Sequence, residues 1–442
     1  KTDLAFEDMG EQQVKNIDRP VRAYRVRLDG QSAGAAEAAV SQTPALELPN
    51  KPSIAVLPFE NMSGDPEQEY FSDGIAEDII TDLSKISGLF VIARNSAFAY
   101  KGQNPDVRQV CRDLGVRYVL EGSVRKAGGR VRINAQLIDG STGGHLWAER
   151  YDRHLEDIFA VQDEVTREIV EALKVELTAG ERRRREGRGK VDPEAYDCLV
   201  RARTCLFQFS AEGLVESRAM LERAIELDRG FAPAYAQLAI VHCVEYANGW
   251  NDPGPDHLAR ALELAHKARE SDENEPQAYH ALALAQMWLR RLEEAERAGE
   301  RAIELDPNFA GAYTALGLVR DYAGGHQSAI ELFEQALRLD PQYELALHFL
   351  GRAQFGLKRY DEAEVSFRRR LTRNPRSDMT RTFLASLYGH TGRREEARRM
   401  WREALEINPD YSVDHLRRVL PYRDPAWFDH FVGGLEAAEL PE

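Results

Sequence analysis

One group that could do chemistry is a serine flanked by glycines, because Gly30-Gln-Ser32-Ala-Gly34 has the Gly-x-Ser-x-Gly pattern of a hydrolase nucleophile. That pattern works only when a strand leads into the serine, a helix follows it, and an acid and a histidine complete a triad. Residues 29–50 are instead small, polar and poor in aromatic side chains, which is typical of a flexible linker. We therefore interpret the pattern as a coincidence.

The 11 histidines and 4 cysteines are the remaining candidates for metal binding or nucleophilic catalysis. Neither an HExxH nor a CxxC pattern occurs, and His145 and His154 have no further candidate ligand at a metal-binding spacing. Cys198 and Cys205 lie on one face of a predicted helix, where free thiols pack as small apolar groups. The sequence thus predicts no metal site, no cofactor and no catalytic residue in this chain.

The charge balance is acidic, with 58 Lys and Arg against 73 Asp and Glu and a formal net charge of −15. An acidic chain repels phosphate, so generic nucleic-acid binding is not expected. The basic run Glu181–Lys190 has no interleaved aromatic residues and is interpreted as part of a solvated linker over residues 179–192. No apolar run approaches the ~20 residues of a membrane span, and few, scattered cysteines fit a reducing compartment, so a cytoplasmic location is predicted.

Proline recurs with a period of 34 residues, at Pro307, Pro341, Pro375 and Pro409. The same period holds for a small residue and for an aromatic one: Ala295, Ala329, Ala363 and Ala397, and Phe333, Phe367 and Trp401. A 34-residue period with these features is the signature of tetratricopeptide (TPR) repeats, in which small residues let paired helices approach. We predict an all-α TPR superhelix over residues 193–420 and a capping helix over 421–442.

Two less regular repeats precede these, and they end at Asp228 and Asp272. Their spacing of 44 residues (272 − 228) implies an insertion of about ten residues into the usual TPR period. Asn248–Pro255, which is rich in Gly and Pro, is the obvious insertion and is predicted to expose Trp250.

The first helices of TPR repeats form the concave wall of the superhelix, which is the usual binding surface. Projecting the period onto that wall selects aromatic, imidazole and apolar side chains with one arginine: His280, Leu284, Met287, Trp288, Tyr322, His348, Arg352, Phe355 and His390. This mixture suits a protein or peptide ligand, and Trp250 is added as an exposed candidate. The Lys and Asn positions of the TPR clamp for carboxyl-terminal carboxylates do not match, so a chaperone-tail receptor is not expected.

Residues 51–178 have the pattern of a small α/β domain. Ser53–Pro58 is a compact apolar strand, a helix is predicted to start at Ser72 or Asp73, and a second helix closes at Gly115. Alternating side chains over Arg130–Ile138, after a Gly-Gly turn, predict a hairpin strand buried on one face. The domain therefore has a mixed sheet.

Within this domain, Leu57–Pro66, Tyr70–Gly74 and Leu120–Val124 resemble the TolB amino-terminal-like (FlgO-like) domain. The resemblance spans nearly the whole of residues 51–178. Members of that family serve mostly as partner-binding or sensory modules, and no catalytic residue set is established for them. The resemblance therefore implies a binding module.

Residues 1–28 read as short strands, which are too few to bury a core alone and predict the tail of a domain lying upstream. Phe6–Val26 resembles the carboxyl end of class III nucleotidyl cyclases in the spacing of its Gly, Lys, Pro and Tyr residues. The resemblance implies that two aspartates binding Mg or Mn, and an Asn/Arg pair, lie in that upstream domain. Lys15 matches a family lysine near the ATP phosphates, although an exposed strand lysine is an equal interpretation.

The chain is thus predicted to be α+β and helix-dominated, with a β remnant, a linker, a mixed α/β domain and a TPR array. This order of parts resembles a bacterial class III adenylate cyclase. It implies a non-catalytic, partner-binding region of a parent enzyme that converts ATP to cAMP and dimerises through its cyclase domain. Two alternatives are a stand-alone TPR adaptor and the effector half of a winged-helix transcription regulator.

Overall fold

The computed structural model describes the following residues: 4–12, 21–28, 48–103, 105–127, 129–154, 157–186, 192–207, 210–251, 256–409 and 411–440. Lys15, the Gly30–Gly34 pattern and the end of the basic run, residues 187–190, lie outside them. The chain forms two compact units, residues 1–46 and residues 47–442. Each unit is described by itself.

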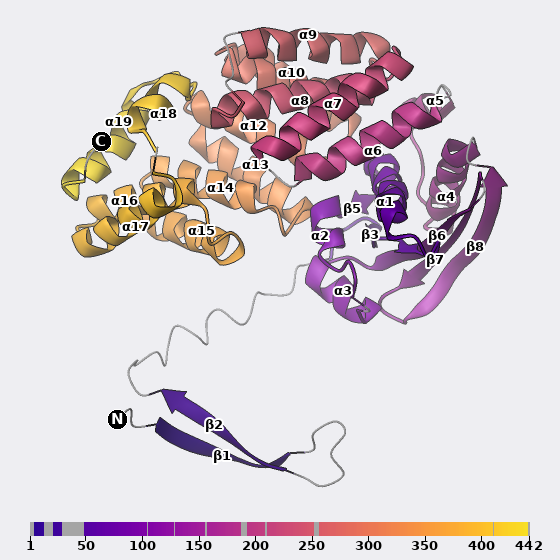
Figure 1. The fold of residues 1–442 in the computed structure, drawn as a ribbon, viewed down its shortest axis with the longest axis horizontal. Coiled ribbons are helices and arrows are strands. Elements are labelled where there is room, and N and C mark those ends of the chain that lie inside the picture. Colours follow the sequence, from indigo (N-terminus) through magenta and orange to yellow (C-terminus); the bar gives the residue numbers. More distant parts are fainter. Residues whose placement is uncertain are drawn as a thin grey trace. The chain divides into compact units, whose positions relative to one another are not determined.

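The first unit contains a two-stranded antiparallel sheet of β1 (Leu4–Gln12) and β2 (Val21–Leu28) (Figure 1). Leu4 lies opposite Leu28, and the register shifts between Asp8 and Glu11. The strand predicted around residues 21–26 is therefore confirmed as part of β2.

The second unit begins with a mixed sheet whose main strand order is β5-β3-β6-β7-β8, with β4 also paired to β6. β3 is parallel to β5 and β6, whereas β6, β7 and β8 are antiparallel. The strand bounds are β3 (Ser53–Val56), β4 (Glu60–Asn61), β5 (Phe90–Val91), β6 (Tyr118–Ala127), β7 (Arg130–Asp139) and β8 (Gly144–His154). The predicted mixed sheet is confirmed.

Helices cover both faces of this sheet. α1 (Glu69–Ser84) and α4 (Ile158–Ala172) pack on one face, and α2 (Arg94–Phe98) and α3 (Val107–Leu114) pack on the other. Gly115 ends α3 in the left-handed region with φ of 62°, as predicted from its type. α1 starts at Glu69, after a 3₁₀ turn, and so begins before the predicted Ser72 or Asp73.

The rest of the second unit is a stack of helices. After α5 (Ala179–Glu186), the helices pack in consecutive pairs. The pairs are α6 (Pro193–Phe207) and α7 (Ala211–Leu227), α8 (Ala232–Asn248) and α9 (Asp256–Ser271), α10 (Pro276–Trp288) and α11 (Leu292–Leu305), α12 (Ala310–Tyr322) and α13 (His326–Leu339), α14 (Glu344–Gly356) and α15 (Tyr360–Arg373), and α16 (Asp378–His390) and α17 (Arg394–Ile407). α18 (Val413–Val419) and α19 (Ala426–Ala437) follow. This is the predicted helix-dominated TPR superhelix.

Glycines in the first helices set how closely the paired helices approach. A Cβ atom on Gly317 would lie 2.6 Å from the Phe333 ring, and one on Gly351 would lie 2.6 Å from the Phe367 ring. These distances are far shorter than carbon–carbon contacts of about 3.5–4.0 Å, so only glycine fits. The repeated Gly and Phe positions therefore pack against each other.

The α/β part packs onto the ends of the repeats within the second unit. Ser84 Oγ donates to Asp306 at 2.6 Å, and Ser96 Oγ donates to Asp340 at 2.5 Å. Asn308 Nδ2 donates to the carbonyl oxygens of Ser84 and Leu89. The Asp residues that close two successive repeats thus dock the sheet domain, and the two parts form one compact unit.

Candidate functional site

The concave side of the repeats is lined by the chain's own C-terminal segment, residues 420–427. The backbone N–H of Arg423 donates to the carbonyl oxygen of Tyr322 at 2.9 Å. Arg290 Nη2 donates to the carbonyl oxygens of Arg418 and Leu420 at 3.0 and 3.1 Å. Leu420 and Tyr422 also pack against the apolar cluster formed by α10 to α14. This segment therefore covers part of the predicted groove.

A buried ionic network lies beneath the segment. Arg352 is 5% exposed; its Nε donates to Asp321 Oδ2 at 2.9 Å, and its Nη2 lies 2.7 Å from the same oxygen in an ion pair. Its Nη1 donates to the Tyr322 hydroxyl at 2.9 Å, and its guanidinium lies over the ring of Tyr322. Asp321 Oδ1 is 2.5 Å from His326 Nδ1. Every charged group of this network thus has a close partner.

The same surroundings keep Arg352 charged. Burial by itself lowers the pKa of Arg352, but Tyr322, Tyr422 and Asp321 raise that pKa overall. The Tyr422 ring lies edge-on to the Tyr322 ring, with centroids 4.9 Å apart. The segment therefore contributes an aromatic wall to an ion pair that is shielded from water.

The predicted groove residues are mostly inside the protein. Five of them are buried, namely Met287, Tyr322, His348, Arg352 and Phe355. Leu284, which the period also placed on this wall, and four other candidates are half-buried: His280, Trp288, His390 and Trp250. The expected exposure of Trp250 is wrong, because this side chain packs against the core of the first repeats. Binding of a partner by these residues stays a prediction.

Two of these histidines are fixed by neighbours that the sequence did not indicate. His348 Nδ1 lies 3.1 Å from Thr380 Oγ1, and burial lowers the pKa of His348 well below its usual value. The His390 ring stacks on the His430 ring of α19 with centroids 4.2 Å apart, and the Phe355 ring lies 4.8 Å from the His430 ring. α19 therefore seals the end of the groove.

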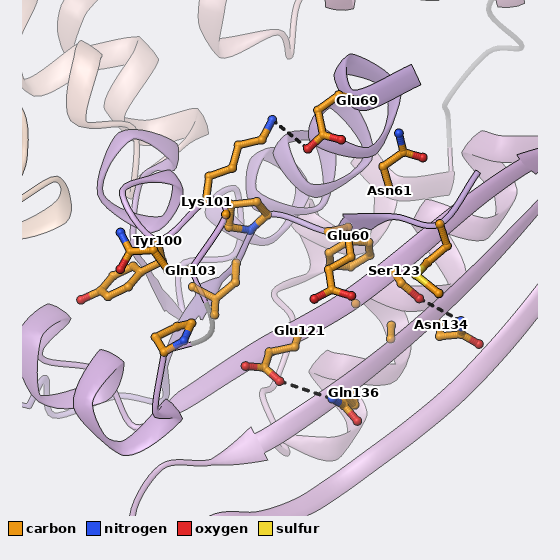
Figure 2. A pocket seen from close by; sticks show the side chains of 18 of the residues that line it. Glu60, Asn61, Glu69, Tyr100, Lys101, Gln103, Glu121, Ser123, Asn134 and Gln136 are labelled. Carbon is orange, nitrogen blue, oxygen red and sulfur yellow. Dashed lines mark hydrogen bonds and ion pairs between the residues drawn. The ribbon is translucent and has the colours of Figure 1, made fainter. Parts of the chain in front are cut away.

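A pocket of about 1190 Å³ lies on the α/β part, between the β3–β4 connection, the loop after α2, and strands β6 to β8 (Figure 2). Glu121 and Gln136 point into it and are joined by a hydrogen bond of 3.3 Å. Burial raises the pKa of Glu121, and Gln136 opposes that shift. Lys101 lies at the rim, where it pairs with Glu69 and Asp73. The sequence analysis missed this pocket, because its walls come from segments far apart in the chain.

A third cluster brings His242, Glu245 and His257 together at the α8–α9 pair. Their nearest ligand atoms all lie within 4.8 Å of one another, and Glu245 is fully buried. Burial, with the charges of His257, Arg218 and Arg260, lowers the pKa of His242 to about 4. The sequence analysis missed this cluster, since the fold joins side chains that share no recognisable sequence motif.

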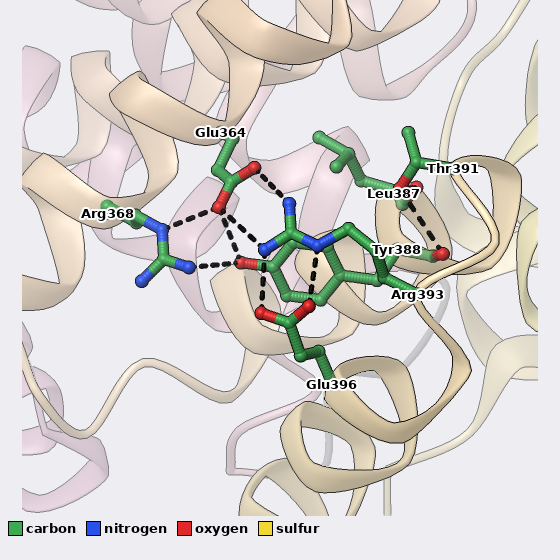
Figure 3. A network of polar contacts seen from close by, with 7 residues as sticks. All are labelled: Glu364, Arg368, Leu387, Tyr388, Thr391, Arg393 and Glu396. Atoms are coloured by element: carbon green, nitrogen blue, oxygen red, sulfur yellow. Dashed lines mark hydrogen bonds and ion pairs between the residues drawn. The ribbon is translucent and has the colours of Figure 1, made fainter.

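A more open network ties α15, α16 and α17 together (Figure 3). Arg393 is bound by Glu364 and Glu396 at 2.6 Å each, and Arg368 donates to both Glu364 and the Tyr388 hydroxyl. Because Arg393 is about a third exposed, this network is a surface brace between repeats.

Sequence comparison finds families that are similar to both parts of the second unit. Residues 276–309, 323–379 and 380–411 match tetratricopeptide repeat families, so the chain contains TPR repeats. Residues 50–168 match the family described as "HilA/YgeH-like transcriptional regulator, second domain". The chain thus contains TPR repeats, and its α/β domain is similar to the domain of that description, where the sequence analysis noted a TolB-like resemblance.

One curated relative is "Putative adenylate cyclase 3" of Rhizobium meliloti (strain 1021), which is 62% identical over 298 residues. The alignment covers 67% of this chain and 50% of the relative, so the chain spans about half the length of that protein. Among the residues that the structure describes, no helix is long and apolar enough to cross a membrane.

Two solved structures are similar to this chain at a low level. The Cut9–Hcn1 hetero-tetramer of APC/C has a TM-score of 0.42 and 21% identity, over 50% of this chain and 43% of that chain. TTC0263, a thermophilic TPR protein of Thermus thermophilus, has a TM-score of 0.37 and 20% identity, over 44% of this chain and 98% of that chain. Similarity at this level concerns the fold alone.

Proposed function

We propose that this chain is the non-catalytic regulatory and protein-binding region of a class III adenylate cyclase. The observation that carries this proposal is the 62% identity to the Rhizobium meliloti protein, which is named as an adenylate cyclase. A parent enzyme of this kind would convert ATP to cAMP with Mg or Mn bound in its cyclase domain, and it would dimerise through that domain. The sequence resemblance of Phe6–Val26 to the end of such a domain supports the same interpretation, with Lys15 on the ATP phosphate side.

The TPR array is the partner-binding part in this proposal. The half-buried His280, Trp288 and His390 would contact a protein or peptide ligand, and the buried Arg352 and Phe355 would hold the wall in place. The C-terminal segment 420–427 would be the first part of the chain that such a ligand meets. The pocket beside Glu121 gives the α/β domain a second surface of its own.

The proposal is tested by the coding DNA upstream of Lys1 and by an activity assay. We expect an in-frame extension of about 150 codons or more, the size of a domain, carrying two metal-binding aspartates. The extended protein should form cAMP from ATP with Mg or Mn, and this chain alone should form none. A start codon close to Lys1, or cAMP formation by this chain alone, would overturn the proposal.

A second candidate is the effector half of a winged-helix transcription regulator. The match of residues 50–168 to the second domain of a transcriptional regulator favours it. An upstream winged-helix domain in place of the cyclase domain would establish this candidate. If neither domain precedes the chain, a stand-alone TPR adaptor remains.

A further inference from the structure

His242, Glu245 and His257 have a spacing that suits a shared metal ion better than hydrogen bonds. His242 Nδ1 and His257 Nδ1 are 3.4 Å apart, and Glu245 Oε2 is 3.7 and 3.6 Å from them. Nitrogen–oxygen hydrogen bonds are shorter, at about 2.7–3.2 Å. A four-coordinate zinc ion with bonds of about 2.0–2.1 Å holds its ligand atoms about 3.3–3.5 Å apart. The three atoms thus lie close to the corners of such a site.

The fold fixes each ligand on a helix. His242 and Glu245 are three residues apart on α8, so their side chains share a face, and His257 is the second residue of α9. The two imidazole rings are nearly perpendicular, at 79°, with both Nδ1 atoms turned toward the carboxylate. The site therefore joins the two helices that the Asn248–Pro255 insertion separates.

Glu245 Oε1 accepts from Asn251 and Arg218, whereas Oε2 accepts from Arg218 alone, so Oε2 is the oxygen that an ion would bind. Asn251 Nδ2 donates to Oε1 at 2.9 Å, so this oxygen is oriented by the insertion itself. Such contacts to the second oxygen are typical of metal-binding carboxylates. Arg218 Nη1 lies 3.3 and 3.2 Å from the two oxygens, and its positive charge opposes a cation. Because the Arg218 side chain is 28% exposed, it can turn toward water.

We propose that His242, Glu245 and His257 bind a divalent transition-metal ion, best matched by zinc. Two imidazole nitrogens and one carboxylate oxygen suit zinc and its neighbours, whereas magnesium and calcium prefer oxygen ligands. Three protein ligands leave a fourth position for water or a partner's side chain, and the 20% exposure of His257 leaves the site partly open to solvent. The bound ion thus links α8 to α9, so the packing of these two helices depends on the metal.

The test titrates the chelator-treated full chain with Zn²⁺ in a calorimeter, and with Co²⁺ while the visible spectrum is recorded. We expect one ion per chain and the absorption bands of four-coordinate Co²⁺. His257→Ala should weaken binding at least tenfold. His266→Ala, a half-buried histidine on the same helix, should bind as the unaltered chain does.

Arg218→Met separates a metal site from a polar cluster that merely fills space. Removing the opposing charge should strengthen Zn²⁺ binding several-fold if the ion sits on Glu245 Oε2. Circular dichroism of each variant verifies that the helices are intact. The absence of stoichiometric binding, unchanged binding in His257→Ala, or unchanged binding in Arg218→Met would overturn the proposal.

Discussion

Two buried carboxylates in the TPR array have very different surroundings. Asp321, on α12, is held by Arg352 of α14 and His326 of α13 at 2.5 to 2.9 Å. Glu245, on α8, faces two imidazoles at 3.6 and 3.7 Å and an arginine at 3.2 Å. The first cluster lies where the 34-residue period is regular, and the second lies beside the insertion. The charged groups around Asp321 thus contact one another directly, whereas the nitrogen and oxygen atoms around Glu245 are spaced as around a shared metal ion.

The largest expected effect comes from breaking the closed cluster. Arg352→Met leaves Asp321 buried without its cation, and we expect a loss of about 3–5 kcal/mol in the free energy of unfolding, measured with urea. Arg393→Met, in the exposed network of Figure 3, is the matched control and should cost less than about 1 kcal/mol. Similar losses in the two variants would mean that the closed cluster contributes no more than a surface pair.

A middle-sized effect tests what keeps the regular repeats tight. Gly351→Ala drives a methyl group into the Phe367 ring, so we expect a loss of about 1–3 kcal/mol by urea unfolding. Gly433→Ala in α19 is the control, because a Cβ atom there would lie 3.9 Å from its nearest neighbour, the His390 ring. That variant should be neutral or more stable by up to about 1 kcal/mol. An equal loss in both would show that helix packing at Gly351 is loose.

The smallest effect concerns acid. Since burial lowers the pKa of His348, the unfolded chain takes up a proton below about pH 6.5 while the folded chain does not. The stability contributed by neutral His348 is therefore full above that pH and falls as the pH drops. We expect His348→Asn, which can keep the bond to Thr380, to reduce the loss between pH 7 and pH 5 by on the order of 1 kcal/mol. An unchanged pH slope would contradict this.

Local patterns in the sequence were enough to predict the architecture of the repeats. The periodic prolines, alanines and aromatics predicted the helix pairs, and Gly317 and Gly351 fell where close packing needs them. Gly115 predicted the end of α3 for a similarly local reason, because only glycine adopts that backbone conformation easily. Features set within one repeat or one turn are therefore readable from residue type and spacing.

The sites depend on contacts between distant segments, which spacing does not reveal. The period placed Arg352 and Tyr322 on the concave wall, but Tyr422, which covers them, lies in a segment with no repeat pattern. His257 reaches Glu245 because α9 packs back onto α8. The partner-binding residues stay a prediction for the same reason, since a position on the concave wall does not reveal which segment or ligand contacts it.

The contact of segment 420–427 with α10 and α12 changes how the array is expected to unfold. A simple repeat array behaves as a row of neighbours, so its ends can fray while its middle stays folded. Here Leu420 and Arg423 hydrogen-bond to Arg290 and Tyr322, which lie 130 and 101 residues (423 − 322) upstream, so the segment links distant repeats directly. Repeats α10 to α17 should then melt as a single cooperative block, and releasing the chain's end should loosen its middle.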